Sequence, residues 1–210
     1  MKHIEISAYK GGLGTTTIAC SLAMGLAKND RKVLLVDGSK YGDSLGILNI
    51  GTTSATWEGK PSKANIDGLD VIVTDLSLPM PTHLYHFYDY VIVDAGTTGI
   101  SQYSVNDEGV YRLCVVSNEY LSLRNTVGVK TRFAPSERFS GLAMAFQEGN
   151  ALTANDVKNV MGMEPVIKMD YDPRMSRTID AGLLCHRFTE VVLPWIAPLM
   201  DAVTASKVEA

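Results

Sequence analysis

A glycine-rich segment near the N-terminus has the residue types and spacing of an anion-binding turn. It reads Tyr9-Lys10-Gly11-Gly12-Leu13-Gly14-Thr15-Thr16-Thr17 and follows an apolar run. Glycines let backbone N–H groups approach a phosphate closely, and a helix that starts at the turn adds a favourable dipole. The hydroxyls of Thr16 and Thr17 could bind Mg²⁺ and a phosphate oxygen. A tight turn without a ligand explains the same residues equally well.

Two standard nucleotide-binding patterns do not fit this segment. The P-loop pattern G-x-x-x-x-G-K-[ST] fails because Tyr9 takes the place of the first glycine and Thr15 that of the lysine. The dinucleotide pattern G-x-G-x-x-G also fails, which disfavours a nicotinamide or flavin enzyme.

Alternating strands and helices must position this turn. Apolar runs predict strands at residues 3–9, 32–37, 71–76, 88–95, 112–117, 142–146 and 166–171, and helical periodicity marks 16–28, 121–133, 154–161 and 174–184. Continuously apolar strands are typical of a parallel sheet that is buried on both faces. The order predicts an α/β fold with a doubly wound, mostly parallel sheet and helices on both faces. We interpret residues 47–68 as a loop or short helix of the same domain.

Length and composition bound the function. The chain has 210 residues, which predicts a single domain spanning residues 1–210. Its net charge of −4 disfavours a protein that coats nucleic acid, so DNA binding is possible but not favoured. Three widely spaced cysteines fit a reducing cytosol, and we expect a cytoplasmic protein. We expect neither a signal peptide nor a membrane-spanning segment.

The glycine-rich segment resembles the deviant Walker A motif, K-G-G-x-G-K-[ST]-[ST], of the ParA/MinD family of partition and positioning ATPases. Lys10 matches the family's early signature lysine. Further similarities follow in order along nearly the whole chain: residues 33–43 resemble the second strand and its D-x-D-P-Q-G segment, 88–95 the Walker B strand, 120–126 the next helix, and 151–184 the C-terminal stretch of MinD-like proteins, including the TadZ/CpaE-like pilus-assembly branch. The resemblance implies the P-loop NTPase fold.

The resemblance also implies roles for individual residues. The implied nucleotide-binding residues are Lys10, Gly11, Gly12, Leu13, Gly14, Thr15, Thr16 and Thr17. The implied Mg²⁺ site contains Thr16, Asp37 and Asp94, and the implied catalytic residues are Asp37 and Lys10. ATP or ADP with Mg²⁺ are the expected cofactors.

Three positions depart from the family pattern. Thr15 replaces the P-loop lysine that bridges the phosphates, and Ser39 replaces the second aspartate of D-x-D, which orients the attacking water. Asp43 lies four residues after Ser39 and is a candidate substitute. The family commonly has an asparagine near this point of the chain that recognises the adenine, whereas this sequence has Ala145. Loss of a group that positions the nucleophile costs about 10²–10⁴ in rate, so hydrolysis should be very slow or absent.

The resemblance implies an ATP-dependent switch, in which ATP joins two monomers face to face and the signature lysine reaches the partner's phosphates. Because of the departures, the favoured hypothesis is a degenerate ATPase, a dimeric scaffold for positioning or partition. The alternative is an active switch whose slow hydrolysis is stimulated by a partner. A homodimer and a protein partner or landmark are the expected contacts.

Other residues have simpler interpretations. We expect His83 and His86 on the exposed side of a helix rather than in a metal site. Five arginines could face DNA but are better explained as solvated: Arg132, Arg138, Arg174, Arg177 and Arg187. The apolar segment 191–200 could lie on a membrane, but we expect a strand or loop leading into a core helix that Pro198 starts late. Trp195 at a partner interface is the alternative.

Overall fold

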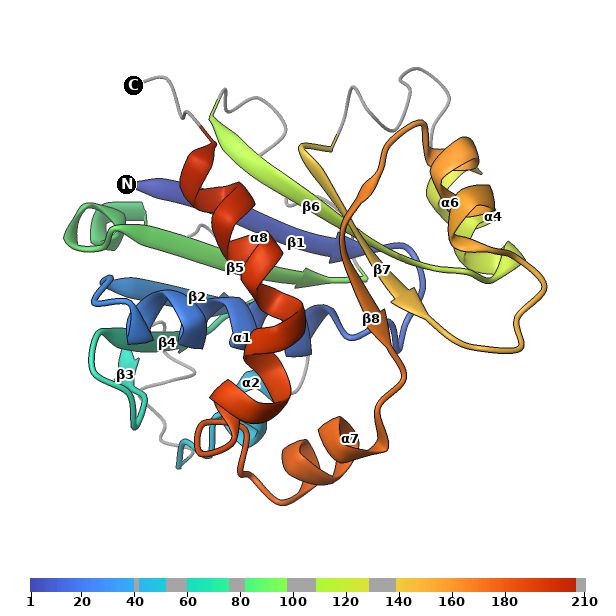
Figure 1. Cartoon of the computed structure of the whole chain (residues 1–210). Coiled ribbons are helices and arrows are strands. Elements are labelled where there is room, and N and C mark those ends of the chain that lie inside the picture. The colour runs from blue at the N-terminus through green and yellow to red at the C-terminus, as the bar shows by residue number, and fades with distance from the viewer. Residues whose placement is uncertain (40–41, 52–59, 76–81, 98–108, 129–138, 207–210) are drawn as a thin grey trace.

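An eight-stranded sheet runs through the centre of the computed structural model (Figure 1). The structure describes residues 1–39, 42–51, 60–75, 82–97, 109–128 and 139–206. The strands are β1 (Lys2–Ala8), β2 (Val33–Asp37), β3 (Ser62–Lys63), β4 (Leu69–Val73), β5 (Tyr90–Gly96), β6 (Val110–Ser117), β7 (Gly141–Phe146) and β8 (Pro165–Asp170). Their order across the sheet is β3-β4-β2-β5-β1-β6-β7-β8. Neighbouring strands are parallel except for β3 and β4.

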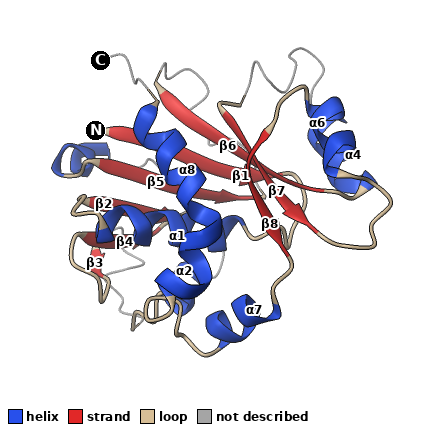
Figure 2. Cartoon of the chain, viewed as in Figure 1, coloured by secondary structure: helices blue, strands red, loops and turns tan. Residues whose placement is uncertain are grey.

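Helices cover both faces of this sheet (Figure 2). The helical elements are α1 (Thr15–Lys28), α2 (Asp43–Ile47), the 3₁₀ helix η1 (Thr82–Phe87), α4 (Tyr120–Gly128), α6 (Ala154–Met161), α7 (Pro173–Asp180), the π-helical turn η2 (Phe188–Val192) and α8 (Leu193–Ala205). Helices α1 and α8 pack on each other over one face. The opposite face is covered by η1 at one side and by α4 and α6 at the other.

The alternation of side chains along each strand explains this layering. On β2, Leu35 joins the core beneath α1 and α8, whereas Leu34 packs with Tyr85 of η1. On β6, Val115 joins the first core and Val116 packs with α4 and α6. Successive strand residues point to opposite faces, so a strand that is apolar throughout is buried on both. The predicted doubly wound α/β fold is confirmed.

The central strand β1 is the point where the strand order reverses. It pairs with β5 on one side and with β6 on the other, so β2 to β5 lie on one side of it and β6 to β8 on the other. In open α/β sheets, ligands bind in the crevice at the carboxyl ends of the strands at such a point. The glycine-rich turn follows β1 at this edge.

Close packing joins α1 to the C-terminal helices. A Cβ added at Gly25 of α1 would lie 2.5 Å from the Met200 sulfur and 3.1 Å from the Phe188 ring. Glycine is therefore needed at this position for α8 and η2 to approach α1 so closely. At the far end of α8, the Lys2 ammonium donates hydrogen bonds to the carbonyls of Val203, Thr204 and Ser206 at 3.0, 2.5 and 2.8 Å.

Some expected boundaries were wrong. The segment 47–68 includes the short strand β3, which pairs antiparallel with β4. Helix α7 ends at Asp180 rather than 184, and α4 is described as far as Gly128, so the rest of the expected helix 121–133 lies outside the described residues. Pro198 does not start the last helix late: α8 begins at Leu193, with Pro194 in its first turn and Pro198 inside.

The apolar C-terminal segment has the expected core contacts. Residues 188–205 form a helical stretch whose length and mean hydropathy of 1.2 are sufficient to cross a membrane, but 39% of it is buried within the protein. Ile196, Leu199 and Val203 are fully buried on the side that packs against α1. We therefore interpret this stretch as a core helix.

Candidate functional site

The glycine-rich turn leaves the first backbone amides of α1 open to a ligand. Gly14 precedes α1 in a left-handed conformation with φ of 83°, and Gly12 has φ of 77°, which other residues adopt only with strain. No side chain caps this helix start, and its first turn holds no acidic residue. The unpaired N–H groups and the helix dipole favour an anion at this position.

Two buried carboxylates lie side by side beneath the turn. Asp37 ends β2 and is the register partner of Asp94 on β5, and neither side chain is exposed to solvent. The Asp37 carboxylate accepts hydrogen bonds from the backbone N–H groups of Ser39 at 2.7 Å and Ser44 at 2.9 Å. Both of its oxygens therefore hold the turn that leads into α2.

Asp94 faces the glycine-rich turn. Its Oδ2 accepts a hydrogen bond from the Thr16 hydroxyl at 2.5 Å, and its Oδ1 accepts one from Gly96 N–H at 3.1 Å. Burial raises the pKa of Asp94 to about 6, although the Thr16 hydrogen bond lowers it, and the nearby Asp37 charge raises it further. A carboxyl group with this environment would be stabilised as the anion by a divalent cation.

A cavity of about 540 Å³ opens beside the turn, within the size range of small-molecule sites. Ser117, Ala145 and Met169 form its floor, in register across the ends of β6, β7 and β8. The facing wall is largely apolar and comes from α7, η2 and α8: Met175, Ile179, Val191, Pro194 and Trp195. One end of the cavity is thus lined by backbone amides and the other by apolar side chains.

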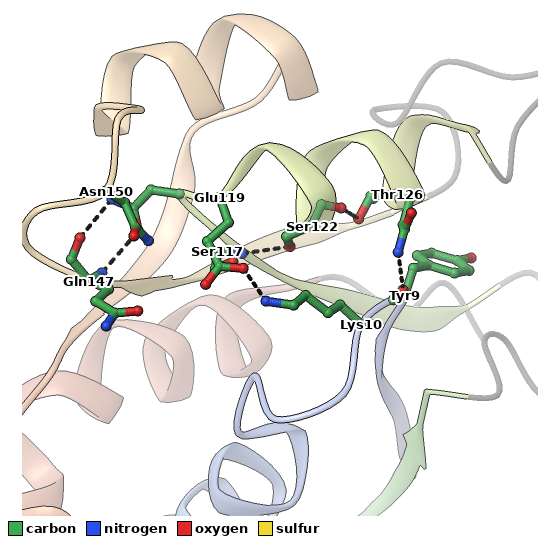
Figure 3. A network of polar contacts seen from close by, with 10 residues as sticks. Tyr9, Lys10, Ser117, Glu119, Ser122, Thr126, Gln147 and Asn150 are labelled. Carbon is green, nitrogen blue, oxygen red and sulfur yellow. Dashed lines mark hydrogen bonds and ion pairs between the residues drawn. The ribbon is translucent and has the colours of Figure 1, made fainter.

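Three cations line the same cavity, and a carboxylate of the chain pairs with each of them. Lys10 forms an ion pair with Glu119 at the start of α4 (Figure 3). Lys168 pairs with Asp170 at 2.9 Å and lies 3.9 Å from the centre of the Phe146 ring. Arg174 pairs with Asp172 at 2.8 Å. A negatively charged ligand would have to compete with these carboxylates.

A polar network fixes the cavity edge that lies between β6 and β7 (Figure 3). The Asn118 side chain accepts from Gln147 N–H at 2.9 Å and donates to the carbonyls of Gln147 and Leu152 at 2.9 and 3.0 Å. Ser117 N–H donates to the Ser122 hydroxyl at 2.9 Å. Because these groups satisfy one another, Asn118 and Ser122 set backbone positions rather than offer groups to a ligand.

The structure brings most of the implied site residues together. Lys10, Gly11, Gly12, Leu13, Gly14 and Thr17 line the cavity, while Thr16 contacts Asp94. Thr15, the residue in place of the P-loop lysine, also contributes to lowering the pKa of Asp94.

The departures from the family pattern have local structural roles. The Ser39 hydroxyl accepts a hydrogen bond from Asp43 N–H at 3.0 Å, and Asp43 itself is exposed. Asp43, like Asp37 and Asp94, lies outside the residues that line the cavity. Ala145 does line the cavity, at the end of β7.

The two histidines, the arginines and Trp195 differ in their surroundings. His83 and His86 are exposed on η1, and the described residues contain no group of three or more potential metal ligands from His, Cys, Asp and Glu. Arg187 pairs with Glu190 at 2.7 Å, whereas Arg132 and Arg138 lie outside the described residues. Trp195 is half-buried in the cavity wall.

Sequence inspection missed Ser117, Glu119 and Lys168 as cavity residues. Ser117 and Lys168 lie at or near the carboxyl ends of predicted strands. Because ligands bind at that edge of an open α/β sheet, this position could have identified both as candidate site residues. Glu119 follows β6 by two residues, but nothing in its local sequence indicates that it pairs with Lys10.

Comparisons with known proteins place these observations in context. The sequence model of a family described as an AAA domain matches residues 1–50. An uncharacterized ATP-binding protein of Methanocaldococcus jannaschii is 28% identical over 191 residues, covering 78% of this chain and 73% of that protein. The chromosome-partitioning ATPase Soj of Thermus thermophilus is 27% identical over 188 residues, covering 75% and 74%.

Solved structures share the fold across the whole chain. The MinC:MinD cell division protein complex of Aquifex aeolicus contains a chain that superposes with a TM-score of 0.74 at 17% identity, covering 100% of this chain and 98% of that one. The septum site-determining protein MinD of Pyrococcus horikoshii, complexed with Mg-ADP, gives a TM-score of 0.74 at 16% identity, covering 97% and 96%.

Proposed function

The sequence relatives and the shared fold support assignment of the chain to the ParA/MinD family of P-loop ATPases, and from this premise we propose that it is a nucleotide-binding positioning or partition protein with weak or absent ATP hydrolysis. It acts in the cytoplasm as a homodimeric scaffold for a protein partner or landmark. The observation that carries this proposal is the intact Thr16–Asp94 pair below an open glycine-rich turn, at a site that lacks the P-loop lysine.

The residues present fit a nucleotide and Mg²⁺. The first amides of α1 accommodate phosphate oxygens, and the cavity has space for a nucleoside. The buried Asp94 carboxyl, with its pKa raised by burial, fits a divalent cation, and Thr16 supplies a neighbouring hydroxyl oxygen. When bound, Mg²⁺ would neutralise phosphate charge at this end of the site.

The same residues argue against fast hydrolysis. At position 15 an uncharged threonine takes the place of a cation that would stabilise charge on the transferred phosphoryl group. Asp37 has both oxygens bonded to backbone N–H groups, and Ser39 holds the following turn through its hydroxyl. None of these three side chains is arranged to orient a nucleophilic water. We therefore assign Asp37 a positioning role and not the catalytic role that the resemblance implied.

Binding and assembly test this proposal together. Calorimetry with ATP, ADP and a non-hydrolysable ATP analogue in Mg²⁺ should give micromolar affinity that EDTA weakens. Solution mass measured in parallel should double with the analogue, while phosphate release stays near background. If millimolar nucleotide gives no heat and no change in melting temperature, the proposal is wrong and the turn is a structural relic.

A second candidate is an ATPase that a partner activates. The retained Thr16–Asp94 pair supports it, because a protein that only scaffolds has no need for a metal site. An activating partner would supply the missing cation in trans, as arginine fingers do for other P-loop enzymes. Stimulated phosphate release on addition of a partner captured with the analogue-bound dimer would distinguish this candidate from the scaffold.

A further inference from the structure

We propose that Glu119 competes with the nucleotide for the phosphate subsite. In the free protein its carboxylate pairs with Lys10. When the nucleotide binds, a phosphoryl oxygen displaces this carboxylate from Lys10 and also accepts a hydrogen bond from the Ser117 hydroxyl. This inference rests on the proposed nucleotide binding. It adds Glu119 and Ser117 to the site, and it makes the affinity for nucleotide depend on the Glu119 carboxylate.

The Lys10–Glu119 pair lies where a ligand would meet it. Both residues line the cavity, and their side chains are 32% and 34% exposed. Lys10 belongs to the glycine-rich turn that leads into α1, and its side chain extends to Glu119 at the start of α4 (Figure 3). A carboxylate on this lysine satisfies the same charge that a phosphoryl oxygen would.

Ser117 supplies an independent observation that points to a ligand. Its side chain is 4% exposed, yet the Oγ atom has no hydrogen-bond partner among the described residues. Buried hydroxyls are normally paired, and an unpaired one calls for a specific explanation. Ser117 lines the same cavity as Lys10 and Glu119, and its backbone is fixed by the bond to Ser122.

Strand pairing explains why these three residues meet. Ala8 of β1 is the register partner of Val115 on β6, so the chain just beyond Ala8 runs beside Ser117. Even residues of β6 face α4 and α6, whereas odd residues, such as Leu113 and Val115, face α1. Ser117 continues the odd series and so lies on the side of the sheet where α1 and the cavity are found.

Displacement of Glu119 has a clear energetic consequence. In the free protein the ion pair must break before Lys10 can contact a phosphate, and the released carboxylate then stays near a like charge. Exposed ion pairs contribute modestly, so removing the competing charge should tighten phosphate binding about three- to tenfold. The displaced Glu119 would be free for another contact in the bound state.

Glu119→Gln tests the competitor directly. Calorimetry should show ATP, the non-hydrolysable analogue and inorganic tripolyphosphate binding about three- to tenfold more tightly than to the wild type. The matched control is Glu164→Gln, which removes the same charge from an exposed pair with Lys158 and lies outside the cavity lining. It should leave all three affinities unchanged.

Ser117→Ala tests the second donor. Loss of a hydrogen bond to a charged oxygen should weaken nucleotide binding about tenfold, while the melting temperature stays equal or rises because no partner is lost. A lower melting temperature with unchanged affinity would instead show a structural hydroxyl and remove Ser117 from the proposal.

The outcomes separate this inference from the proposed function. If the wild type binds nucleotide and Glu119→Gln binds no more tightly than Glu164→Gln, the competitor is overturned and the proposed function stands. If the wild type and both variants bind neither nucleotide nor tripolyphosphate at millimolar concentration, both are overturned. Binding by Glu119→Gln without binding by the wild type would support the competitor but overturn nucleotide binding as the function of the unaltered chain.

Discussion

The two sides of the candidate site differ in how they hold charge. The carboxylate side (Thr16, Asp37 and Asp94) is buried at the ends of two adjacent strands, with each hydrogen bond made to a fixed neighbour. The cation side (Lys10, Thr15 and Lys168) has a threonine where the family pattern has a lysine, and its two cations pair with the chain's own carboxylates. The carboxylate side therefore makes its hydrogen bonds without a ligand. On the cation side, carboxylates of the same chain neutralise the positive charges.

This difference indicates which properties survive when a site changes. Groups at strand ends also maintain the fold, as Asp37 does by accepting the N–H groups of Ser39 and Ser44, so they are costly to replace. A lysine at the surface of a turn has no such second role. Under the proposed function, binding of Mg²⁺ and phosphate would therefore not require the groups that accelerate hydrolysis.

The largest effect should come from Asp94→Asn, which removes the metal-binding charge but can keep the hydrogen bonds to Thr16 and Gly96. Mg²⁺-dependent nucleotide affinity should fall about 100-fold. The control is binding in EDTA, where the variant and the wild type should match. Equal affinity in Mg²⁺ would show that the carboxylate side does not hold the metal.

The same substitution should change stability in the opposite direction. The folded protein holds the Asp94 proton more tightly than the unfolded chain, with a pKa raised from 3.8 to about 6. The wild type therefore loses stability as pH rises through this window, and the loss is complete above it. At pH 7 Asp94→Asn should be more stable by up to about 3 kcal/mol, with no gain near pH 3. Urea unfolding at the two pH values measures the difference.

A double substitution should supply the two charged groups that the family pattern has and this chain does not. Thr15→Lys combined with Ser39→Asp should raise ATP hydrolysis about tenfold or more, because one change supplies phosphate charge and the other a carboxylate for the nucleophile. Thr15→Met with Ser39→Asn is the matched uncharged control. Phosphate release is the measurement, and no gain over the control would show that further groups are missing.

A smaller effect should follow from Thr16→Val, which leaves the carboxylates in place and removes one hydroxyl. The Mg²⁺-dependent part of the affinity should fall about three- to tenfold, and the pKa of Asp94 should rise because the Thr16 hydrogen bond lowers it. Thr16→Ser keeps the hydroxyl and should behave as the wild type does. Carboxyl titration followed by NMR measures the pKa.

The fold was predictable because its signals are local. Each central strand is an uninterrupted apolar run, as in Val33–Asp37, and its burial on both faces follows from that pattern. Strand β3 was missed because Ser62 and Lys63 are polar and pair at an antiparallel edge. The start of α8 was misplaced because two prolines, at 194 and 198, both fit a first helical turn, and tertiary packing decides between them.

The candidate site was predictable only where it follows single strands. Asp37 and Asp94 end apolar runs, so their meeting at one sheet edge could be expected from the motif order. The Lys10–Glu119 pair joins residues 109 positions apart and depends on β1 lying beside β6. The unpaired Ser117 hydroxyl is likewise a product of packing, which no spacing rule reports.

The Lys2 contact with the end of α8 has a consequence for how the chain folds. It joins residues separated by 201 positions, so it can form only after the intervening sheet has assembled. Contacts of such long sequence separation carry a large loop-closure entropy and slow the search for the native state. We expect α8 to dock late and to open early, so that amide protons of this helix exchange with solvent before those of the central strands.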